Sequence, residues 1–390
     1  MIFEFIFLLF SFIFIFYLVK NINIQKKINI INLKESFINK ISESNYIEYI
    51  KTPKRKSFTI LSYNILSQRF MKRKEIKSLC LEIRIPKIIN EINQENPDIF
   101  CLQESTFDVY QKYFSKSFNE YEIIKYENDG SNLMNLIGIK KNRFTILNEC
   151  KFDLSNKIID ISGNRGVINV KIKDNFMKNK IISLFCVHFP WKPIYEYQKA
   201  RILLMIFEFI LYNKNENIII SGDFNSIPNS IPLRMIYYQD FINEFNENKE
   251  YIGDFVFNKN EINLMKELKQ KIKKRENFRN IINRIFEISK LVFEKYFLRS
   301  VYDEYKINKN DLKFNYLRNH PDYTNYTNSF INTIDYIIYS KFLEKVKIKK
   351  IPIINNDYLP NENYPSDHLK LFAEFKYSKI INKNIYKTKK

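Results

Sequence analysis

Acidic and amide side chains stand directly beside short apolar runs at three places in this chain. Glu104 ends the run DIFCLQE, Asp223 and Asn225 end NIIISGDFN, and Asp367 precedes the run LKLFAEF. Taken singly, a Glu after a strand is more often a helix cap or a surface charge, and Asp-x-Asn is equally well an Asx-turn. Together, Glu104, Asp223 and Asp367 offer the hard oxygen ligands that Mg²⁺ prefers. The pattern therefore predicts a metal site that acts on a phosphate group.

The histidines support this prediction. The chain has three of them, at 188, 320 and 368. His188 follows the apolar run KIISLFCV, and His368 follows Asp367, so two of the three stand at strand boundaries beside polar residues. A lone histidine is usually structural, but imidazoles beside a metal site can hold a phosphate and stabilise its developing charge. We expect His188 and His368 to have that role, with His368 opening the strand that follows it.

These side chains need a scaffold that brings strand ends together. From Phe58 onward, helical patterns alternate with the β-rich runs FTILSYNIL, DIFCLQE, KIISLFCVHF, NIIISGDFN and, late in the chain, TIDYIIYS. Buried strands that alternate with helices indicate an α/β fold. Ligand sites in α/β folds lie where strands end. Gly222 would let the backbone turn just before Asp223.

The motifs around these residues, taken in their order along the chain, resemble those of the endonuclease/exonuclease/phosphatase superfamily. Within it they are most similar to the branch that contains Ccr4-type deadenylases, nocturnin, Angel proteins and 2'-phosphodiesterase. The resemblance rests on SYNIL at 62–66, LQE at 102–104, HFPWKP at 188–193, GDFNS at 222–226, TNYTNSFINTIDYIIYS at 324–340 and LPNENYPSDH at 359–368. Each motif alone is weak, but the six together are specific, and they span about Phe58 to Tyr377.

The resemblance implies a DNase I-like fold, which is a four-layer α/β sandwich of two mixed β-sheets flanked by helices. It also implies a role for each motif residue. Mg²⁺, with Mn²⁺ as an alternative, is held by Glu104, Asn64 and Asp367; His188 faces the scissile phosphate; Asp223 orients or deprotonates the attacking water; Asn225 binds phosphate; and Asp335 supports the closing His368. Arg165 is a further candidate for contact with phosphate.

The branch motifs favour a Ccr4-like 3'-5' exoribonuclease acting on poly(A)-type RNA. A hydrolase of small nucleotides, similar to nocturnin or 2'-phosphodiesterase, is the first alternative, and a phosphoesterase of membrane lipids such as sphingomyelin or phosphoinositides is the second. A catalytically inactive binding module is disfavoured because the acidic residues and both histidines are present. The leucine-rich repeats that some deadenylases carry are absent, so assembly into their usual complex is not expected, and the sequence indicates no protein partner.

The composition is that of an ordered globular chain with a strong basic excess. The 390 residues include 63 Lys and Arg and 43 Asp and Glu, which gives a formal charge of +20. This charge would attract RNA or an acidic membrane surface, although codon bias in an AT-rich genome explains it equally well. The four cysteines lie far apart, which predicts neither zinc nor a disulfide scaffold and fits reduced thiols.

The organisation of the chain follows from these patterns. Residues 2–19 are almost wholly apolar and long enough to span a bilayer, so residues 1–19 are predicted to be a signal anchor or transmembrane helix, with a cleaved signal peptide as the alternative. Lysines after this segment favour a membrane-anchored enzyme with a cytosolic catalytic domain over one in the secretory pathway or an organelle lumen. A polar basic linker is expected at 20–55, the catalytic domain at 56–378 and a basic tail at 379–390.

Two features of the catalytic domain have alternative interpretations. The Lys- and Arg-rich segment 258–298 has helical apolar spacing and is predicted to be a helical insertion, either with a solvated amphipathic face or in contact with nucleic acid. Trp191, the only tryptophan, lies three residues after His188. Its ring either packs beneath the turn or offers a platform on which a base can stack.

Overall fold

A computed structural model of the chain describes residues 56–71, 79–127, 132–152, 166–178, 180–192, 195–238, 278–303, 320–355 and 357–378. The predicted anchor, linker and basic tail lie outside these residues, as do Arg165 and the first part of the predicted insertion, 258–277. The boundaries proposed for those segments remain predictions. Among the described residues, none of the helices combines the length and apolar character that a membrane crossing requires.

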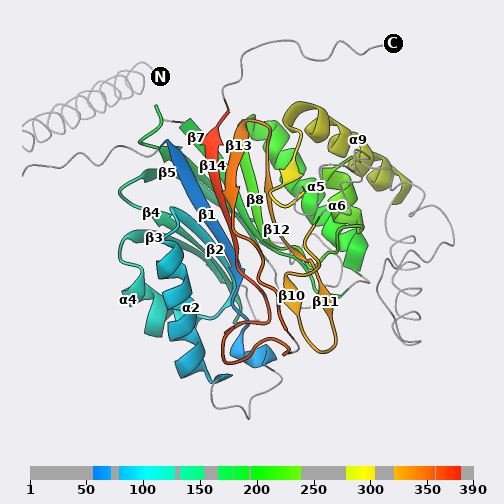
Figure 1. The fold of residues 1–390 in the computed structure, drawn as a ribbon. Coiled ribbons are helices and arrows are strands. Elements are labelled where there is room, and N and C mark those ends of the chain that lie inside the picture. The colour runs from blue at the N-terminus through cyan, green and yellow to red at the C-terminus, as the bar shows by residue number, and fades with distance from the viewer. Residues whose placement is uncertain are drawn as a thin grey trace, which may run out of the picture. The chain divides into compact units, whose positions relative to one another are not determined.

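Two six-stranded sheets form the centre of the described unit (Figure 1). The first sheet has the order β13-β14-β1-β2-β4-β3, with β1 at Ser57–Asn64, β2 at Ile99–Ser105, β3 at Tyr121–Glu127, β4 at Met134–Lys140, β13 at Leu343–Ile348 and β14 at Leu371–Tyr377. The second sheet has the order β5-β6-β7-β8-β12-β9, with β5 at Phe144–Phe152, β6 at Val167–Asp174, β7 at Lys180–His188, β8 at Asn217–Asp223, β9 at Arg299–Ser300 and β12 at Asp335–Tyr339. Both sheets are mixed, because β1 pairs with β2 and β7 with β8 in parallel while the other neighbours are antiparallel.

Helices cover the outer faces of both sheets. The first sheet carries α2 (Leu81–Glu95) and a segment made of α3 (Phe107–Val109), the π-helical turn η3 (Tyr110–Phe114) and α4 (Ser115–Ser117). The second sheet carries α5 (Glu196–Asn213), α6 (Ile231–Ile236) and α9 (Phe278–Tyr296). Smaller elements are the 3-10 turn η1 (Gln68–Phe70) and the hairpin of β10 (Asn325–Tyr326) and β11 (Ile331–Asn332). The expected four-layer α/β sandwich is confirmed.

Three apolar cores lie between these layers. One fills the space between the two sheets, and the others lie between each sheet and its helices. Strands with apolar contacts on both faces read as continuous hydrophobic runs, not as alternating ones. All seven residues of β8 are buried, as are the last seven of β1 and of β7. This double burial explains why the five β-rich runs could be recognised in the sequence.

Two predicted elements differ in detail from the structure. His368 does not open a strand: it forms an isolated bridge with Asn325, and β14 begins only at Leu371. This bridge attaches His368 to the β10–β11 hairpin. In the predicted insertion, the described part is α9, which buries Ile285, Val292 and neighbouring residues against the second sheet and its helices. This part of the segment is therefore an integral piece of the outer helical layer.

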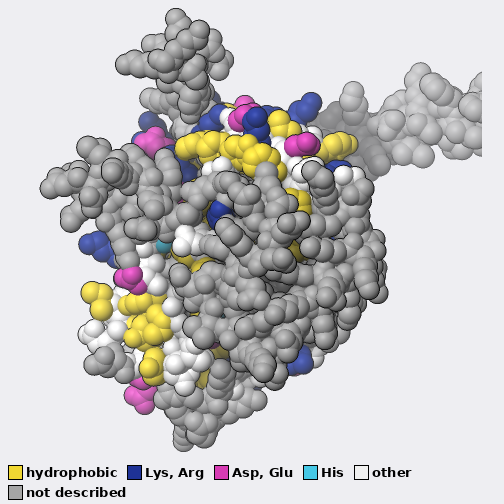
Figure 2. Space-filling view, turned by 90° about the vertical axis from the view of Figure 1, so that its right-hand side faces the viewer, with side chains coloured by type: hydrophobic (Ala, Val, Ile, Leu, Met, Phe, Trp, Pro, Cys, Tyr) yellow, Lys and Arg dark blue, Asp and Glu magenta, His cyan; other side chains and the backbone are white. Residues whose placement is uncertain are grey.

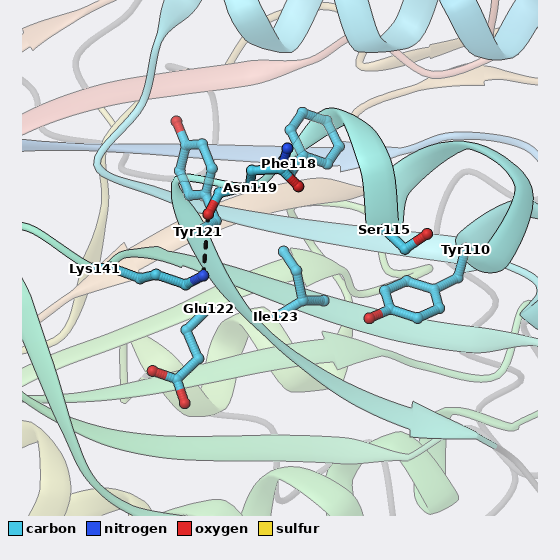
Figure 3. A pocket seen from close by; sticks show the side chains of 8 residues that line it. All are labelled: Tyr110, Ser115, Phe118, Asn119, Tyr121, Glu122, Ile123 and Lys141. Atoms are coloured by element: carbon cyan, nitrogen blue, oxygen red, sulfur yellow. Dashed lines mark hydrogen bonds between the residues drawn. The ribbon is translucent and has the colours of Figure 1, made fainter.

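The described surface has no single electrostatic character on the face drawn in Figure 2. There, Lys and Arg side chains lie near Asp and Glu side chains and beside exposed hydrophobic ones. A separate hollow of about 650 Å³ lies beside β3 and the α3–α4 segment (Figure 3). Its lining includes Tyr110, Glu122 and Lys141, and Lys141 donates to the carbonyl of Asn119 at 3.0 Å. None of the predicted catalytic residues lines this hollow.

Candidate active site

Three neighbouring strands of the second sheet place three predicted residues side by side. In the pairing of β7 with β8, His188 lies opposite Asp223, and in the pairing of β12 with β8, Asp335 lies opposite the same Asp223. Residues that are directly opposite on adjacent strands share one face of a sheet. Gly222 is needed here, because its φ of 145° is unfavourable for other residues and a Cβ would lie 2.0 Å from the carbonyl oxygen of Val187.

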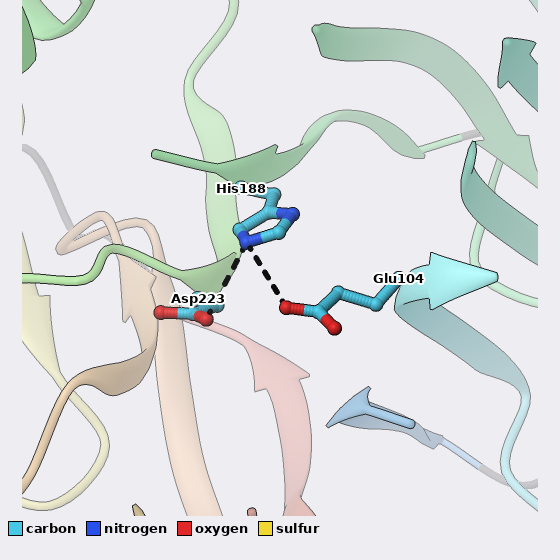
Figure 4. Close-up of side chains that lie close together, drawn as sticks. All are labelled: Glu104, His188 and Asp223. Carbon is cyan, nitrogen blue, oxygen red and sulfur yellow. Dashed lines mark ion pairs between the residues drawn. The ribbon is translucent and has the colours of Figure 1, made fainter. Parts of the chain in front are cut away.

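Glu104 reaches this group from the other sheet. Its φ of 62° falls where the pairing of β2 with β4 is irregular, between Leu102 and Ser105. A left-handed conformation at a residue other than glycine costs energy and is found often at functional sites. His188 Nε2 lies 3.7 Å from Glu104 Oε1 and 3.7 Å from Asp223 Oδ2 (Figure 4). The seam between the two sheets thus brings two carboxylates around one imidazole.

His368 completes the group from the segment before β14. Its Nδ1 lies 2.9 Å from Asp335 Oδ2, and its Nε2 lies 3.9 Å from both Asp223 Oδ2 and Asp367 Oδ1. Asp335 Oδ2 also accepts a hydrogen bond of 2.6 Å from Thr324 Oγ1. A hydrogen bond at Nδ1 orients the ring and leaves Nε2 directed at the carboxylates. Asp335 therefore contacts His368 as expected for a residue that holds the imidazole in place.

Burial and crowding change the acidity of these groups. Burial, and then the charge of Asp335, raises the pKa of Asp223 to about 7. Burial, and then the charge of Asp367, raises the pKa of Glu104. For His368, burial alone would lower the pKa, but the carboxylates of Asp335, Asp367 and Asp223 raise it well above its ordinary value. Buried acids with raised pKa values beside a charged imidazole are typical of functional sites.

The two predicted amides mainly hold the carboxylates. Asn64 Nδ2 donates to Glu104 Oε1 at 3.2 Å and to Asp223 Oδ2 at 3.0 Å, while its Oδ1 accepts from the backbone N–H of Leu66. Asn225 has a φ of 47°, and its Nδ2 donates to the carbonyl of Phe189 and to Asp223. The backbone N–H of Asn225 donates to Asp223 Oδ1 at 2.7 Å, which is the Asx-turn weighed from the sequence. Metal binding by Asn64 and phosphate binding by Asn225 stay predictions.

The donor set fits a divalent cation. Glu104, His188 and Asp223 offer ligand atoms within 4.8 Å of one another, and so do Asp223, Asp335 and His368. Asp367 Oδ1 is buried without a hydrogen-bond partner in the structure, although a buried carboxylate oxygen normally has one. Clustered carboxylates of this kind repel one another unless a cation or protons compensate their charge. The site therefore has the composition of a divalent-metal centre.

Some site features were missed by the sequence analysis. Lys199 of α5 is fully buried; it donates to Glu196 Oε1 at 2.8 Å and also to the carbonyl of Asn225. It thereby fixes the turn that follows Asp223. Its position among buried apolar residues of α5 was the available signal, because a lysine is seldom buried without a partner. The predicted platform residue Trp191 is 57% exposed, so its ring does not pack beneath the turn.

The third histidine, His320, lies in a separate buried cluster. Its Nε2 lies 3.3 Å from Tyr237 Oη and 3.5 Å from Asp303 Oδ1. Burial lowers the pKa of His320 to about 4 and raises that of Asp303 to about 7. His320 is therefore neutral at physiological pH, in contrast to His368.

Comparison with known proteins agrees with this geometry. The family model described as Endonuclease/Exonuclease/phosphatase family matches residues 61–368, which include the predicted site residues from Asn64 to His368. The chain belongs to this family.

A curated relative is the probable CCR4-Not complex 3'-5'-exoribonuclease subunit Ccr4 of Enterocytozoon bieneusi, 26% identical over 344 residues. The match covers 76% of this chain and 59% of that protein. Among solved structures, ANGEL2, described as a 2',3'-cyclic phosphatase in complex with adenosine-2',3'-vanadate, has a TM-score of 0.62 at 22% identity, over 82% of this chain and 95% of that one. The human Nocturnin catalytic domain with bound sulfate has a TM-score of 0.55 at 19% identity, over 83% and 96%. The structural likeness establishes the shared fold.

Proposed function

We propose that this chain is a Mg²⁺-dependent phosphodiesterase that removes nucleotides from the 3' end of RNA. The observation that carries the proposal is the buried group between the two sheets, where His188 Nε2 lies 3.7 Å from both Glu104 Oε1 and Asp223 Oδ2. The likeness to Ccr4 proteins named as 3'-5'-exoribonucleases supports RNA as the substrate. Hard oxygen donors favour Mg²⁺, with Mn²⁺ as the alternative.

In this proposal each residue of the group has a part. Glu104 would hold the cation together with Asn64 and Asp367, and the bound cation would polarise a phosphoryl oxygen and the leaving group. Asp223, with a pKa raised to about 7, is matched to accept a proton from water near neutral pH. His368, kept charged by Asp335, would donate from Nε2 to the negatively charged phosphate oxygens, and His188 would face the same group. Asn225 would contact a non-bridging oxygen.

Substrate choice depends on what surrounds this polar group. Trp191 is exposed three residues after His188, and Lys192 Nζ lies 5.5 Å from the centre of its ring. An exposed indole beside a cation can stack a nucleobase and approach a backbone phosphate. This pair supports a nucleotide substrate over a lipid, which has no base to stack.

Hydrolysis of a substrate panel tests the proposal. The full chain is offered oligoadenylate, a 2'-phosphorylated dinucleotide, a nucleoside 2',3'-cyclic phosphate and sphingomyelin vesicles with Mg²⁺. We expect oligoadenylate to be shortened from its 3' end, with a rate that falls steeply as salt increases. Rapid turnover of a small nucleotide with RNA untouched would replace this proposal by the small-nucleotide alternative. Hydrolysis of sphingomyelin alone would make a nucleotide substrate wrong.

Membrane attachment through residues 2–19 is a separate proposal that rests on their apolar sequence. With the catalytic domain on the cytosolic side, protease added to intact membranes should degrade that domain before detergent is added. Protection of the domain, or a mature N-terminus beyond residue 19, would contradict the orientation or the anchor.

A further inference from the structure

The six motifs that carry the resemblance include no residue of α2, yet Arg84 of this helix is fully buried and its guanidinium contacts the loops that adjoin the proposed metal site. Its guanidinium donates from Nη1 to the carbonyls of Ile65 at 3.0 Å and Pro365 at 2.6 Å. It donates from Nη2 to the carbonyl of Leu66 at 2.7 Å and to Gln68 Oε1 at 3.2 Å. One side chain therefore joins α2 to two loops that are about three hundred residues apart in the sequence.

Both loops deliver parts of the metal site. In the first loop, the backbone N–H of Ser67 donates to Glu104 Oε2 at 3.0 Å, and that of Leu66 donates to Asn64 Oδ1. In the second loop, Pro365 is followed by Ser366, whose Oγ donates to the carbonyl of Asn64 at 2.7 Å. The next residue is Asp367, whose buried Oδ1 has no hydrogen-bond partner in the structure.

We propose that Arg84 is a positioning residue for the metal site, holding the loops of residues 65–68 and 365–368 at a fixed separation so that Glu104 and Asp367 face the same cation. The inference rests on the proposed metal-dependent function. Arg84 touches neither substrate nor cation; it acts through the backbone carbonyls that it binds.

The geometry requires an arginine at this position. Its planar fork supplies several donors in fixed directions, whereas the ammonium of a lysine is a compact point charge. Arg84→Lys would keep the positive charge but could not reach three carbonyls on two loops at once. Buried carbonyls left without donors would then reorganise, and the loops would lose their common anchor. The cation site would widen although each of its ligands is still present.

Arg143 provides a matched control. It is also a fully buried arginine: it donates to the carbonyl of Ser57 and to the carboxylates of Asp98 and Asp174. Ser57 is the first residue of β1, whereas Asn64 at the site is the last. Arg143→Lys therefore damages a comparable buried network at the far end of the same strand.

The test measures two properties of the full chain and of each variant. One is the affinity for Mn²⁺ without any substrate, by electron paramagnetic resonance or calorimetry, and the other is the thermal unfolding midpoint. We expect both arginine variants to lower the midpoint. Arg84→Lys should weaken Mn²⁺ binding by about 10- to 100-fold, which is the usual effect of losing residues that orient metal ligands. Arg143→Lys should leave Mn²⁺ affinity within about twofold of the wild-type value, because distant sites act independently.

Ser366→Ala gives a second variant if Arg84→Lys does not fold, since it removes the other link between the loops. It should weaken Mn²⁺ binding in the same direction but less. If Arg84→Lys folds and binds Mn²⁺ as tightly as the wild type, the inference is wrong and the proposed function still stands. If Arg84→Lys does not fold, unchanged Mn²⁺ affinity in Ser366→Ala has the same meaning. Absence of Mn²⁺ binding by the wild-type chain would overturn the metal-dependent function and this inference with it.

Discussion

The contact between Asp335 and His368 allows a test of whether His368 needs the negative charge of Asp335 or only its hydrogen bond. Asp335→Asn keeps an oxygen that can accept from both Thr324 Oγ1 and the imidazole, so the ring can stay in place while the negative charge disappears. Unit charges 2.9 Å apart attract each other by on the order of 6 kcal/mol at an effective dielectric constant of about 20. Removing one partner of a buried pair lowers the free energy of unfolding by about 3 to 5 kcal/mol. If His368 acts as a charged donor to the phosphate, losing its charge also removes about 3 kcal/mol of transition-state stabilisation, which corresponds to a decrease in kcat of about 10².

Histidine-selective NMR titration measures the charge directly, because the chain contains only three histidines. In the wild-type protein, His368 should stay protonated through neutral pH, while His320, whose pKa burial lowers to about 4, stays neutral. Asp335→Asn should lower the pKa of His368, since Asp335 is the leading carboxylate that raises it, and leave His320 unchanged.

Asp303→Asn is the matched control for this prediction, because Asp303 is a buried acid beside the other buried histidine. It should leave the titration of His368 and the value of kcat as they are. If Asp335→Asn folds and leaves both the pKa of His368 and kcat unchanged, the reasoning about this pair is wrong.

Three further predictions follow from the same structure. EDTA should abolish hydrolysis, and Glu104→Gln should lower kcat by about 10² or more with the unfolding midpoint nearly unchanged; a fully active variant would refute a metal role for Glu104. Trp191→Ala should raise the KM for oligoadenylate by about 5- to 150-fold, from a stacking contribution of about 1 to 3 kcal/mol, whereas Tyr212→Ala, at an 86% exposed tyrosine, should not. Between pH 4 and 6.5 the free energy of unfolding of Asp303→Asn should change more favourably than that of the wild type, by roughly 3 kcal/mol. The reason is that the folded wild type keeps the proton of Asp303, whose pKa is raised to about 7, whereas the unfolded chain loses it. Denaturant titrations of both chains at the two pH values measure this difference, and the same pH dependence in both would contradict it.

Much of the fold could be predicted because strands that are buried on both faces leave long apolar runs in the sequence. NIIISGDFN and KIISLFCVHF correspond to β8 and β7, and DIFCLQE corresponds to β2. The site residues could be located as the polar ends of those runs.

The contacts between these strand ends could not be derived from the sequence. Which residue lies opposite Asp223 depends on strand register, and Asp335 is more than a hundred residues further along the chain. The left-handed conformation of Glu104 arises from an irregular pairing of β2 with β4, and no glycine marks this position. Arg84 and Lys199 were overlooked because a basic residue in a lysine-rich sequence looks like a surface residue until its partners are known.

The position of the site at the seam of two sheets also has an evolutionary consequence. Glu104 comes from one sheet and Asp223 from the other, so closing the sandwich forces like charges together inside the protein. The raised pKa of Asp223 means that the folded chain without a cation disfavours its ionised carboxylate at neutral pH. A substitution that removes one of these like charges and also provides for the donors of Asn64 and Asn225 that Asp223 now accepts from would stabilise the cation-free fold. A copy of this gene released from selection at the site would be free to accumulate such substitutions, and its fold would become more stable as the site is lost.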